Sequence, residues 1–403
     1  MTDRRYWIWF SSMTDISLNS KANLLEFFGS PENAFNSTRG TISGIEGISA
    51  HDAEIMEQRD MERVERIIGL CEKNGERIIT IDSPLYPSSL KEIYAPPYVI
   101  YVKGELPDFA EHPGVSVIGT RRASAYGMKM GRNIAYELIK CGVTVITGLA
   151  AGIETESAKA ALLAGGPVLA VIGTPIEKAT GELLSEIEQK GAVVSEYPPE
   201  TVTRRHFFRY KNRICAGCSM GVLAVEAPEQ SGTRLFIAEA LEQGKEIFAV
   251  PGNADSENSR GILKFIRDGA IPVAHGWEIA EILNESGYVS LNCESREIYP
   301  DNSAVAKPDK VSSKTSNAKN KPENKKIIDN EKVGCYIDIS ELTEPQKLIV
   351  NTLSISSAGV DELVELCDMP SAAILAELTM LQIDGIVVKE AGGTFKLAGN
   401  EDM

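Results

Sequence analysis

From Gly114 onward, short apolar runs alternate with longer amphipathic stretches. The runs are rich in Val, Ile and Ala and lack a polar side, which is typical of strands buried on both faces. Most of the stretches between them carry apolar residues at helical spacing. This alternation predicts an α/β fold with a doubly wound, mostly parallel sheet covered by helices. The expected strands are 115–118, 143–146, 168–172, 192–195, 222–225, 247–250 and 271–274, and the clearest helices are 126–140, 155–163 and 235–243.

The front of the chain has a different pattern, with short helical segments and turn-rich connections. We expect one helix over 23–28 and a longer one over 50–71, where apolar and charged residues interleave. A short strand at 78–81 precedes a proline-marked extended segment that ends near Gly104. These patterns predict a small helical (SAM-like) domain over residues 1–80 and an extended Rossmann-like domain over residues 81–298.

The last part of the chain contains a polar segment and a second small domain. Residues 299–338 are rich in Lys, Ser, Asn and Pro, a composition that buries too little apolar surface to fold and therefore predicts a flexible linker. Residues 339–403 then read as three helices followed by a hairpin that turns at Gly392-Gly393. This order predicts a winged-helix domain.

Composition favours a cytoplasmic globular protein. Of the 403 residues, 43% are hydrophobic and 24% are charged. The N-terminal segment is too weakly apolar for a signal peptide, and no apolar run approaches the length of a membrane helix, so we expect no membrane contact. Seven cysteines at scattered positions do not indicate a disulfide framework.

The net charge of −16 conceals two windows without acidic residues, 112–136 and 201–225. Because the attraction of phosphate is local and screened by salt, an acidic protein can still present one basic groove. Two exposed basic helix faces without a partner remain the simpler alternative. The basic residues in these windows are Arg121, Arg122, Lys129, Arg132, Arg204, Arg205, Arg209, Lys211 and Arg213.

Glycine-rich turns follow several of the predicted strands. In VIGTRRASAYG, Gly119 ends a strand and a helix begins near Ser124, which places backbone N–H groups at the carboxyl edge of the sheet, where anions bind. The segment ITGLAAGIE repeats this arrangement with Gly148 and Gly152. Ser231-Gly232 opens a later helix, where the serine either contacts phosphate or serves only as an N-cap. None of these turns has the spacing of a dinucleotide motif or a P-loop.

The stretch HFFRYKNRICAGCS interleaves aromatic and basic residues, a combination suited to stacking bases and attracting the backbone of a single strand. Phe207 is equally well explained as a core residue. Cys215 and Cys218 have no second pair or nearby His, so we expect them to pack within a helix rather than bind a metal. No nucleophile or acid–base set stands out, and we expect no enzymatic activity, metal or cofactor.

The predicted winged helix is unusual for a reader of duplex DNA. Residues 341–403 contain eleven Asp or Glu against three Lys, and the predicted third helix, 371–384, has no Lys or Arg. A recognition helix in a major groove normally carries such residues. We therefore interpret this domain as a protein-contact module.

Taken in order, IGTRRASAYG, TGLAAGIE, FFRYKNRICAG, VEAPEQSG and FAVPGN resemble the motifs of the DNA-processing protein A (DprA, or Smf) family. The resemblance spans nearly the whole chain. It implies a protein that binds and protects single-stranded DNA, helps to load the RecA recombinase in natural transformation and recombination, and works as a homodimer through its Rossmann-like domain.

The resemblance also implies a site for DNA phosphates and bases. Two positions depart from the usual G-L-A-R-G-I-D: Ala151 stands in place of Arg and Glu154 in place of Asp. The implied residues are Gly119, Thr120, Arg121, Arg122, Ser124, Gly148, Gly152, Phe208, Lys211, Asn212, Arg213, Ser231 and Gly232.

Two other functions stay open from the sequence. One is a nucleotide-binding enzyme of the phosphoribohydrolase-like Rossmann group, against which the absence of its P-G-G-x-G-T-x-x-E motif counts, since Phe236 stands where that motif has its Glu. The other is a protein-interaction scaffold that has lost DNA binding, which the acidic total and Ala151 favour and the retained arginines oppose.

Overall fold

The computed structural model describes residues 3–204, 206–285, 287 and 290–300, together with shorter stretches of the C-terminal part. Those stretches are 344–353, 359–360, 363–364, 369–383, 387–389 and 394–397. Two compact units divide the chain, Met1–Pro308 and Asp309–Met403. Most of the expected linker lies outside the described residues. Within the described residues, no helix is long and apolar enough to cross a membrane.

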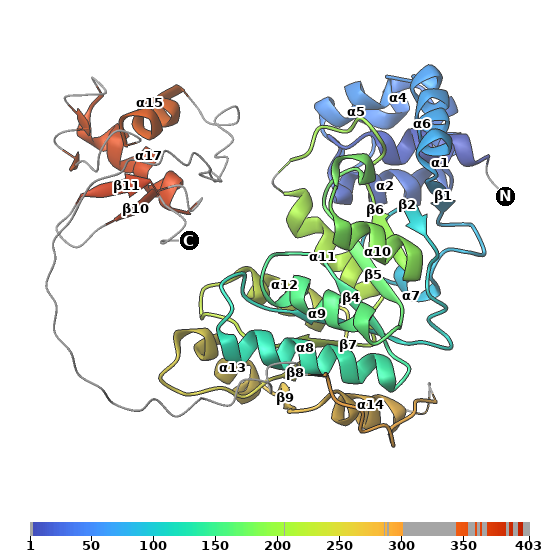
Figure 1. Cartoon of the computed structure of the whole chain (residues 1–403). Helices are drawn as coiled ribbons and strands as arrows, with labels where there is room; N and C mark the ends of the chain where they lie inside the picture. The colour runs from blue at the N-terminus through green and yellow to red at the C-terminus, as the bar shows by residue number, and fades with distance from the viewer. Residues whose placement is uncertain are drawn as a thin grey trace, which may run out of the picture. The chain divides into compact units, whose positions relative to one another are not determined.

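A nine-stranded sheet runs through the first unit in the order β1-β2-β6-β5-β4-β3-β7-β8-β9 (Figure 1). All neighbours from β6 to β9 are parallel, whereas β1 and β2 pair antiparallel and join the sheet through β6. The doubly wound α/β prediction is confirmed. The strands are β1 (Arg77–Thr80), β2 (Val99–Gly104), β3 (Gly114–Ile118), β4 (Thr144–Thr147), β5 (Val168–Ile172), β6 (Ala192–Ser195), β7 (Gly221–Ala224), β8 (Glu246–Ala249) and β9 (Ile271–Pro272).

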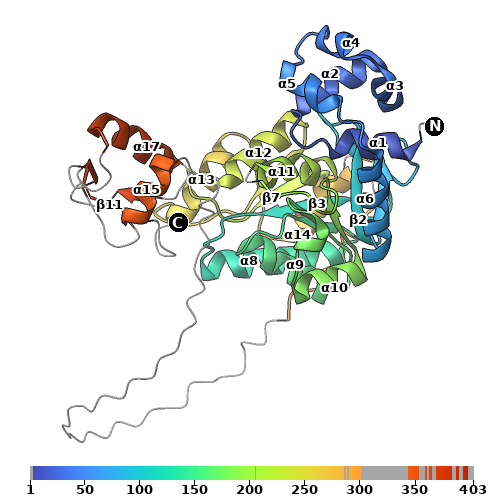
Figure 2. The same cartoon turned by 90° about the horizontal axis from the view of Figure 1, so that it is seen from above.

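Alternate residues of each central strand enter two separate cores. In β5, Val168 and Ala170 pack into one core and Leu169 and Val171 into the other, because successive side chains of a strand point to opposite faces. Figure 2 shows α8, α9 and α10 on one side of the sheet and α11, α12 and α13 on the other. The helices of this region are α7 (Ser88–Lys91), α8 (Ala125–Lys140), α9 (Ile153–Leu163), α10 (Glu182–Lys190), α11 (Phe207–Gly217), α12 (Gly232–Glu242), α13 (Glu257–Arg267) and α14 (Gly276–Glu285).

The front of the chain is helical, as expected, but it shares its core with the sheet. Trp7 stacks on Tyr98 at 5.9 Å between ring centroids, and both belong to the larger of the two cores. The strand β1, placed in the helical domain by the expected boundary at residue 80, pairs with β2 of the sheet. The helices are α1 (Arg4–Ser12), α2 (Leu18–Phe28), α3 (Pro31–Asn36), α4 (Arg39–Ser43), α5 (Ala50–Met56) and α6 (Met61–Asn74).

The single helix expected over 50–71 is wrong, since α5 and α6 are separate helices. The carboxylate of Asp60 accepts the N–H of Arg63 at 2.8 Å and so starts α6 anew. Nearby, the indole of Trp9 donates to the carbonyl of Gln58 at 3.1 Å. The sequence pattern of a single helix is continuous here, but the cap at Asp60 and the contact from α1 divide the segment into two helices.

In the second unit, α15 (Glu344–Leu353) and α17 (Ser371–Ile383) pack on a hairpin of β10 (Val387–Lys389) and β11 (Phe395–Leu397). Ile349, Ile374 and Phe395 are among its buried core residues. These elements fit the expected winged helix. The second expected helix and the turn at Gly392-Gly393 lie largely outside the described residues.

Candidate nucleic-acid interface

The chain reverses its direction of strand addition at β3, because β4 pairs with one side of this strand and β7 with the other. The loops that follow β3 and β7 therefore lead to helices on opposite faces of the sheet. In open α/β sheets, this reversal leaves a crevice at the carboxyl ends of the strands, where ligands bind. Most of the predicted site residues come from the loops and helix starts along this edge.

The loop between β3 and α8 presents the two arginines. Arg121 and Arg122 are exposed, whereas Thr120 is buried and accepts the N–H of Arg122 on its hydroxyl at 3.2 Å. Ser124 caps α8 by accepting the N–H of Gly127 at 3.1 Å. The loop therefore holds two exposed arginines just before the start of α8.

Gly119 and Gly152 are required by the packing of two loops against each other. A Cβ on Gly119 would lie 2.6 Å from Ile153, and one on Gly152 would lie 2.6 Å from the carbonyl oxygens of both Thr120 and Arg121. Gly152 also has a φ of +84°, which disfavours any other residue. These glycines therefore allow the loops after β3 and β4 to pack together. This packing alone explains why glycine is required at both positions, whether or not a ligand binds.

The expectation that phosphates rest on the amides of the Gly148 loop needs correction. The N–H groups of Gly148 and Ala150 both donate to Oε2 of Glu154, at 2.9 and 3.2 Å. The ammonium of Lys211 donates to the carbonyl of Gly148 at 2.8 Å. A side chain of the protein itself already occupies the position expected for an anion.

The helix α11 divides its predicted site residues between surface and interior. Phe208 is 45% exposed, and Asn212 is half-buried. Phe207 is buried and stacks on Tyr197 at 3.7 Å, so the core interpretation of this residue is correct. Lys211 is buried as well.

Arg213 lies inside the protein rather than at the exposed carboxyl edge of the sheet. The residue is 4% exposed, and its guanidinium donates to Glu196 Oε1 at 2.6 Å and to the carbonyls of Ala95 and Tyr210. Because each of its three nitrogens donates to an acceptor inside the protein, the guanidinium is not positioned to contact a phosphate. The resemblance implied a place for Arg213 in the site, and the acid-free window that contains Arg213 gave no sign of Glu196, which lies outside that window.

Ser231 occupies the N-cap position of α12 but makes no capping hydrogen bond. Its Oγ is buried and has no hydrogen-bond partner among the described residues. Gly232, the first residue of the helix, is exposed, and an added Cβ there would meet nothing within 4 Å. The start of α12 is thus accessible at Gly232 but not at the Ser231 hydroxyl, in contrast to the Gly148 loop, whose amides are already bonded to Glu154.

Tyr126 is a candidate that the sequence reasoning missed. It lies in the first turn of α8, is 46% exposed, and donates its hydroxyl to the carbonyl of Pro251 at 2.7 Å. Since Pro251 lies two residues after the end of β8, this bond holds the ring along the carboxyl edge. The available signal was an aromatic residue four positions after Arg122.

Cys215, in α11, and Cys218, the residue that caps the end of this helix, are packing residues, as expected. Cys215 and Cys218 are free and buried, and burial raises the pKa of each thiol to about 12. No group of residues able to hold a metal ion occurs within the described part of the chain.

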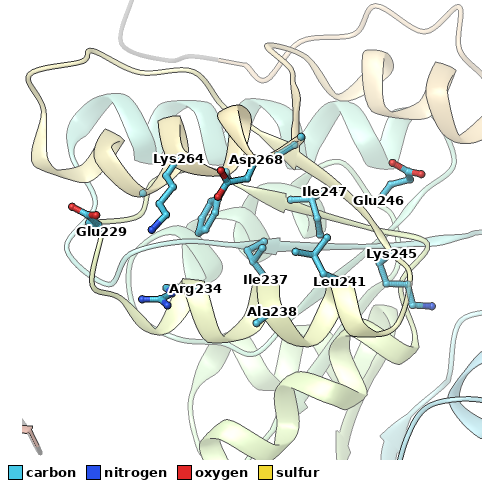
Figure 3. A pocket seen from close by; sticks show the side chains of 14 residues that line it. Glu229, Arg234, Ile237, Ala238, Leu241, Lys245, Glu246, Ile247, Lys264 and Asp268 are labelled. Atoms are coloured by element: carbon cyan, nitrogen blue, oxygen red, sulfur yellow. The ribbon is translucent and has the colours of Figure 1, made fainter.

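A cavity of about 370 Å³ lies between α12 and α13, outside the set of predicted site residues. Figure 3 shows Arg234 and Lys264 near Glu229 at one end, and Ile237, Leu241 and Ile247 farther along. Its apolar lining and mixed charges differ from the basic edge described above.

The fold and these loops define a Rossmann-like α/β protein with a basic edge at the switch point of its sheet. The family described as DNA recombination-mediator protein A matches residues 77–285, and the DprA winged helix domain matches residues 338–393. The chain belongs to the DNA recombination-mediator protein A (DprA/Smf) family, so the resemblance seen in the motifs is confirmed.

Relatives span most of the chain. Protein Smf of Synechocystis sp. is 28% identical over 97% of this chain and 98% of its own length. Protein Smf of Escherichia coli is 34% identical over 65% of this chain and 71% of its own length. The X-ray structure of DprA from Streptococcus pneumoniae superposes with a TM-score of 0.60 at 28% identity, covering 70% of this chain and 98% of that one.

Proposed function

We propose that this chain binds single-stranded DNA along the carboxyl edge of its sheet. The observation that carries the proposal is the exposure of Arg121, Arg122 and Arg209 on the same edge as the exposed rings of Phe208 and Tyr126. Cations attract the phosphates, and aromatic faces accept unpaired bases of any sequence. Family membership supports a role in DNA processing and recombination mediation.

Apart from Tyr126, the proposed contacts are a subset of the residues named from the sequence. Phosphates would lie against Arg121, Arg122 and the start of α12 at Ser231-Gly232, with bases near Phe208. Gly119, Thr120, Ser124, Gly148, Gly152 and Lys211 would shape the loops, and Asn212 would lie at their margin. Arg213 is left out because it is buried with Glu196.

The proposal extends to partners. We infer that the chain acts as a homodimer through its Rossmann-like domain, protects single strands in the cytoplasm and helps RecA to assemble on them. The winged helix would contact a protein, since Leu375 and Met380 of α17 are both exposed. Such apolar surface is often covered by a partner. No catalytic step is part of this proposal, and the buried Phe236 offers no carboxylate for a phosphoribohydrolase.

The test is fluorescence anisotropy of a labelled oligo-dT and of a matched duplex at two salt concentrations. We expect the single strand to bind more tightly, with an affinity that falls steeply as salt rises. Equal or absent binding of both would refute the proposal. If the single strand binds, a strand-exchange assay with RecA on strands coated by single-strand-binding protein then tests the loading step.

A further inference from the structure

A buried carboxylate lies directly beneath the Arg121–Arg122 loop. Glu226, just after β7, is 3% exposed. Its Oε2 accepts the N–H of Ser124 at 2.8 Å, and its Oε1 accepts the hydroxyl of Ser124 at 2.5 Å. A Cβ on Gly127 would lie 2.3 Å from the carboxyl carbon of Glu226, so the first turn of α8 encloses this group.

The same residue also holds the other end of the loop. The carbonyl oxygen of Glu226 accepts the N–H of Thr120 at 2.7 Å. Thr120 and Ser124 flank the two arginines in sequence. Glu226 therefore fastens both ends of a five-residue segment, one through its main chain and one through its side chain.

Asn258, in α13, connects this clamp to the middle of the loop. Its side-chain amide donates to Oε2 of Glu226 at 3.2 Å and to the carbonyl of Arg122 at 3.0 Å. The main-chain carbonyl of Asn258 accepts the N–H of Ala227 at 2.8 Å. The segment that carries the arginines is thus tied both to the loop after β7 and to α13.

We propose that Glu226, together with Asn258, is a positioning residue for Arg121 and Arg122. Its carboxylate does not touch DNA. It fixes the backbone of the arginine loop before a strand arrives, which removes the ordering cost that a mobile loop would add to binding. This inference rests on the proposed function, and it names the part of the protein that prepares the site.

The test is a double-mutant cycle read by anisotropy with oligo-dT. Glu226→Ala should weaken binding about tenfold, equivalent to about 1.4 kcal/mol, because the Ser124 end of the loop is released while the main-chain bond to Thr120 remains. In the Arg121→Ala/Arg122→Ala background, adding Glu226→Ala should weaken binding no further, since Glu226 acts through those arginines. Independent, additive losses would overturn the proposal.

Two further variants and one matched control separate positioning from general destabilisation. Asn258→Ala should weaken binding about threefold, while Glu226→Gln, which keeps an oxygen for the Ser124 N–H, should weaken it less than Glu226→Ala. The control is Glu137→Ala, which removes a similarly buried carboxylate of α8 that accepts the N–H of Gly276 at 2.7 Å. Glu137→Ala should lower thermal stability and leave the affinity of the folded protein unchanged.

Hydrogen exchange of amides 121–124 gives a readout without DNA. Glu226→Ala should accelerate exchange in this segment, and Glu137→Ala should not. A wild-type protein that ignores oligo-dT would refute the proposed function, and this inference with it. If the wild type binds through Arg121 and Arg122 but Glu226→Ala binds equally well, the positioning role alone is refuted.

Discussion

The guanidinium of Arg213 and the carboxylate of Glu196 form an ion pair of 2.6 Å inside the protein, with both side chains largely buried. Glu196 directly follows β6 and Arg213 lies in α11, so the pair ties this helix to the sheet. Its location predicts a structural role for a residue that the sequence grouped with DNA contacts.

Arg213→Ala should lower the free energy of unfolding by about 3–5 kcal/mol, because it leaves the carboxylate of Glu196 without its partner in the interior. The measurement is chemical denaturation. The matched control is Arg132→Ala, whose pair with Glu156 is more exposed and should cost no more than about 1 kcal/mol. Equal losses would contradict the buried placement of Arg213.

Arg121→Ala combined with Arg122→Ala should weaken the binding of oligo-dT and reduce the slope of log affinity against log salt by about 1.4, or roughly 0.7 for each phosphate that is no longer neutralised. The measurement is anisotropy across a salt series. Arg5→Ala with Arg66→Ala removes the same charge from the helical front and should leave the slope unchanged. A slope that responds equally to both double variants would indicate a diffuse charge effect.

Tyr126→Ala should weaken binding about tenfold, because stacking of one base on an aromatic ring contributes about 1–3 kcal/mol. Tyr126→Phe keeps the ring and loses only the bond to Pro251, so it should bind nearly as the wild type does. An abasic strand of equal length provides the control. If Tyr126→Ala weakens binding to the abasic strand as much, the ring does not contact bases.

Lys21 gives a prediction for stability against pH. Its side chain is buried, its ammonium donates to the carbonyl of Ser11 at 2.9 Å, and burial lowers its pKa from 10.5 to about 8. Between these two values the unfolded chain binds more protons than the folded protein, so the contribution of Lys21 to stability rises with pH across this window. Below about pH 8, the charged amine opposes folding by about 3 kcal/mol.

Lys21→Met should therefore stabilise the protein at pH 7, and its advantage over the wild type should shrink as pH rises from about 8 to 10.5. Denaturation of both proteins across this range measures the difference, in which the contributions of tyrosines and cysteines cancel. A constant difference would show that Lys21 keeps its ordinary pKa when folded.

The central strands of the sheet could be predicted because they are buried on both faces and are therefore mostly apolar. The expected run 168–172 coincides with β5, and 192–195 coincides with β6. The break between α5 and α6 could not be predicted in this way, because it depends partly on a contact between Trp9 and Gln58 that joins distant parts of the chain.

The candidate site shows the same limit more sharply. Windows without acidic residues along the sequence are not free of acids in space, since Arg132 pairs with Glu156, Arg204 with Asp15 and Arg213 with Glu196. Two further carboxylates, those of Glu154 and Glu226, accept hydrogen bonds from loop amides that the sequence analysis assigned to phosphate binding. The glycine turns and Arg121–Arg122 were correctly located at the edge, but their hydrogen-bond partners required the fold.

The core shared by α1 and the sheet has a consequence for how such a chain can be shortened. Phe10 and Trp7 both lie against Tyr98, close to the start of β2. The family match begins at residue 77, within β1. A fragment cut there would expose the aromatic surface that α1 covers, and we expect it to aggregate rather than fold. The unit recognised by sequence similarity is therefore smaller than the unit that can exist alone.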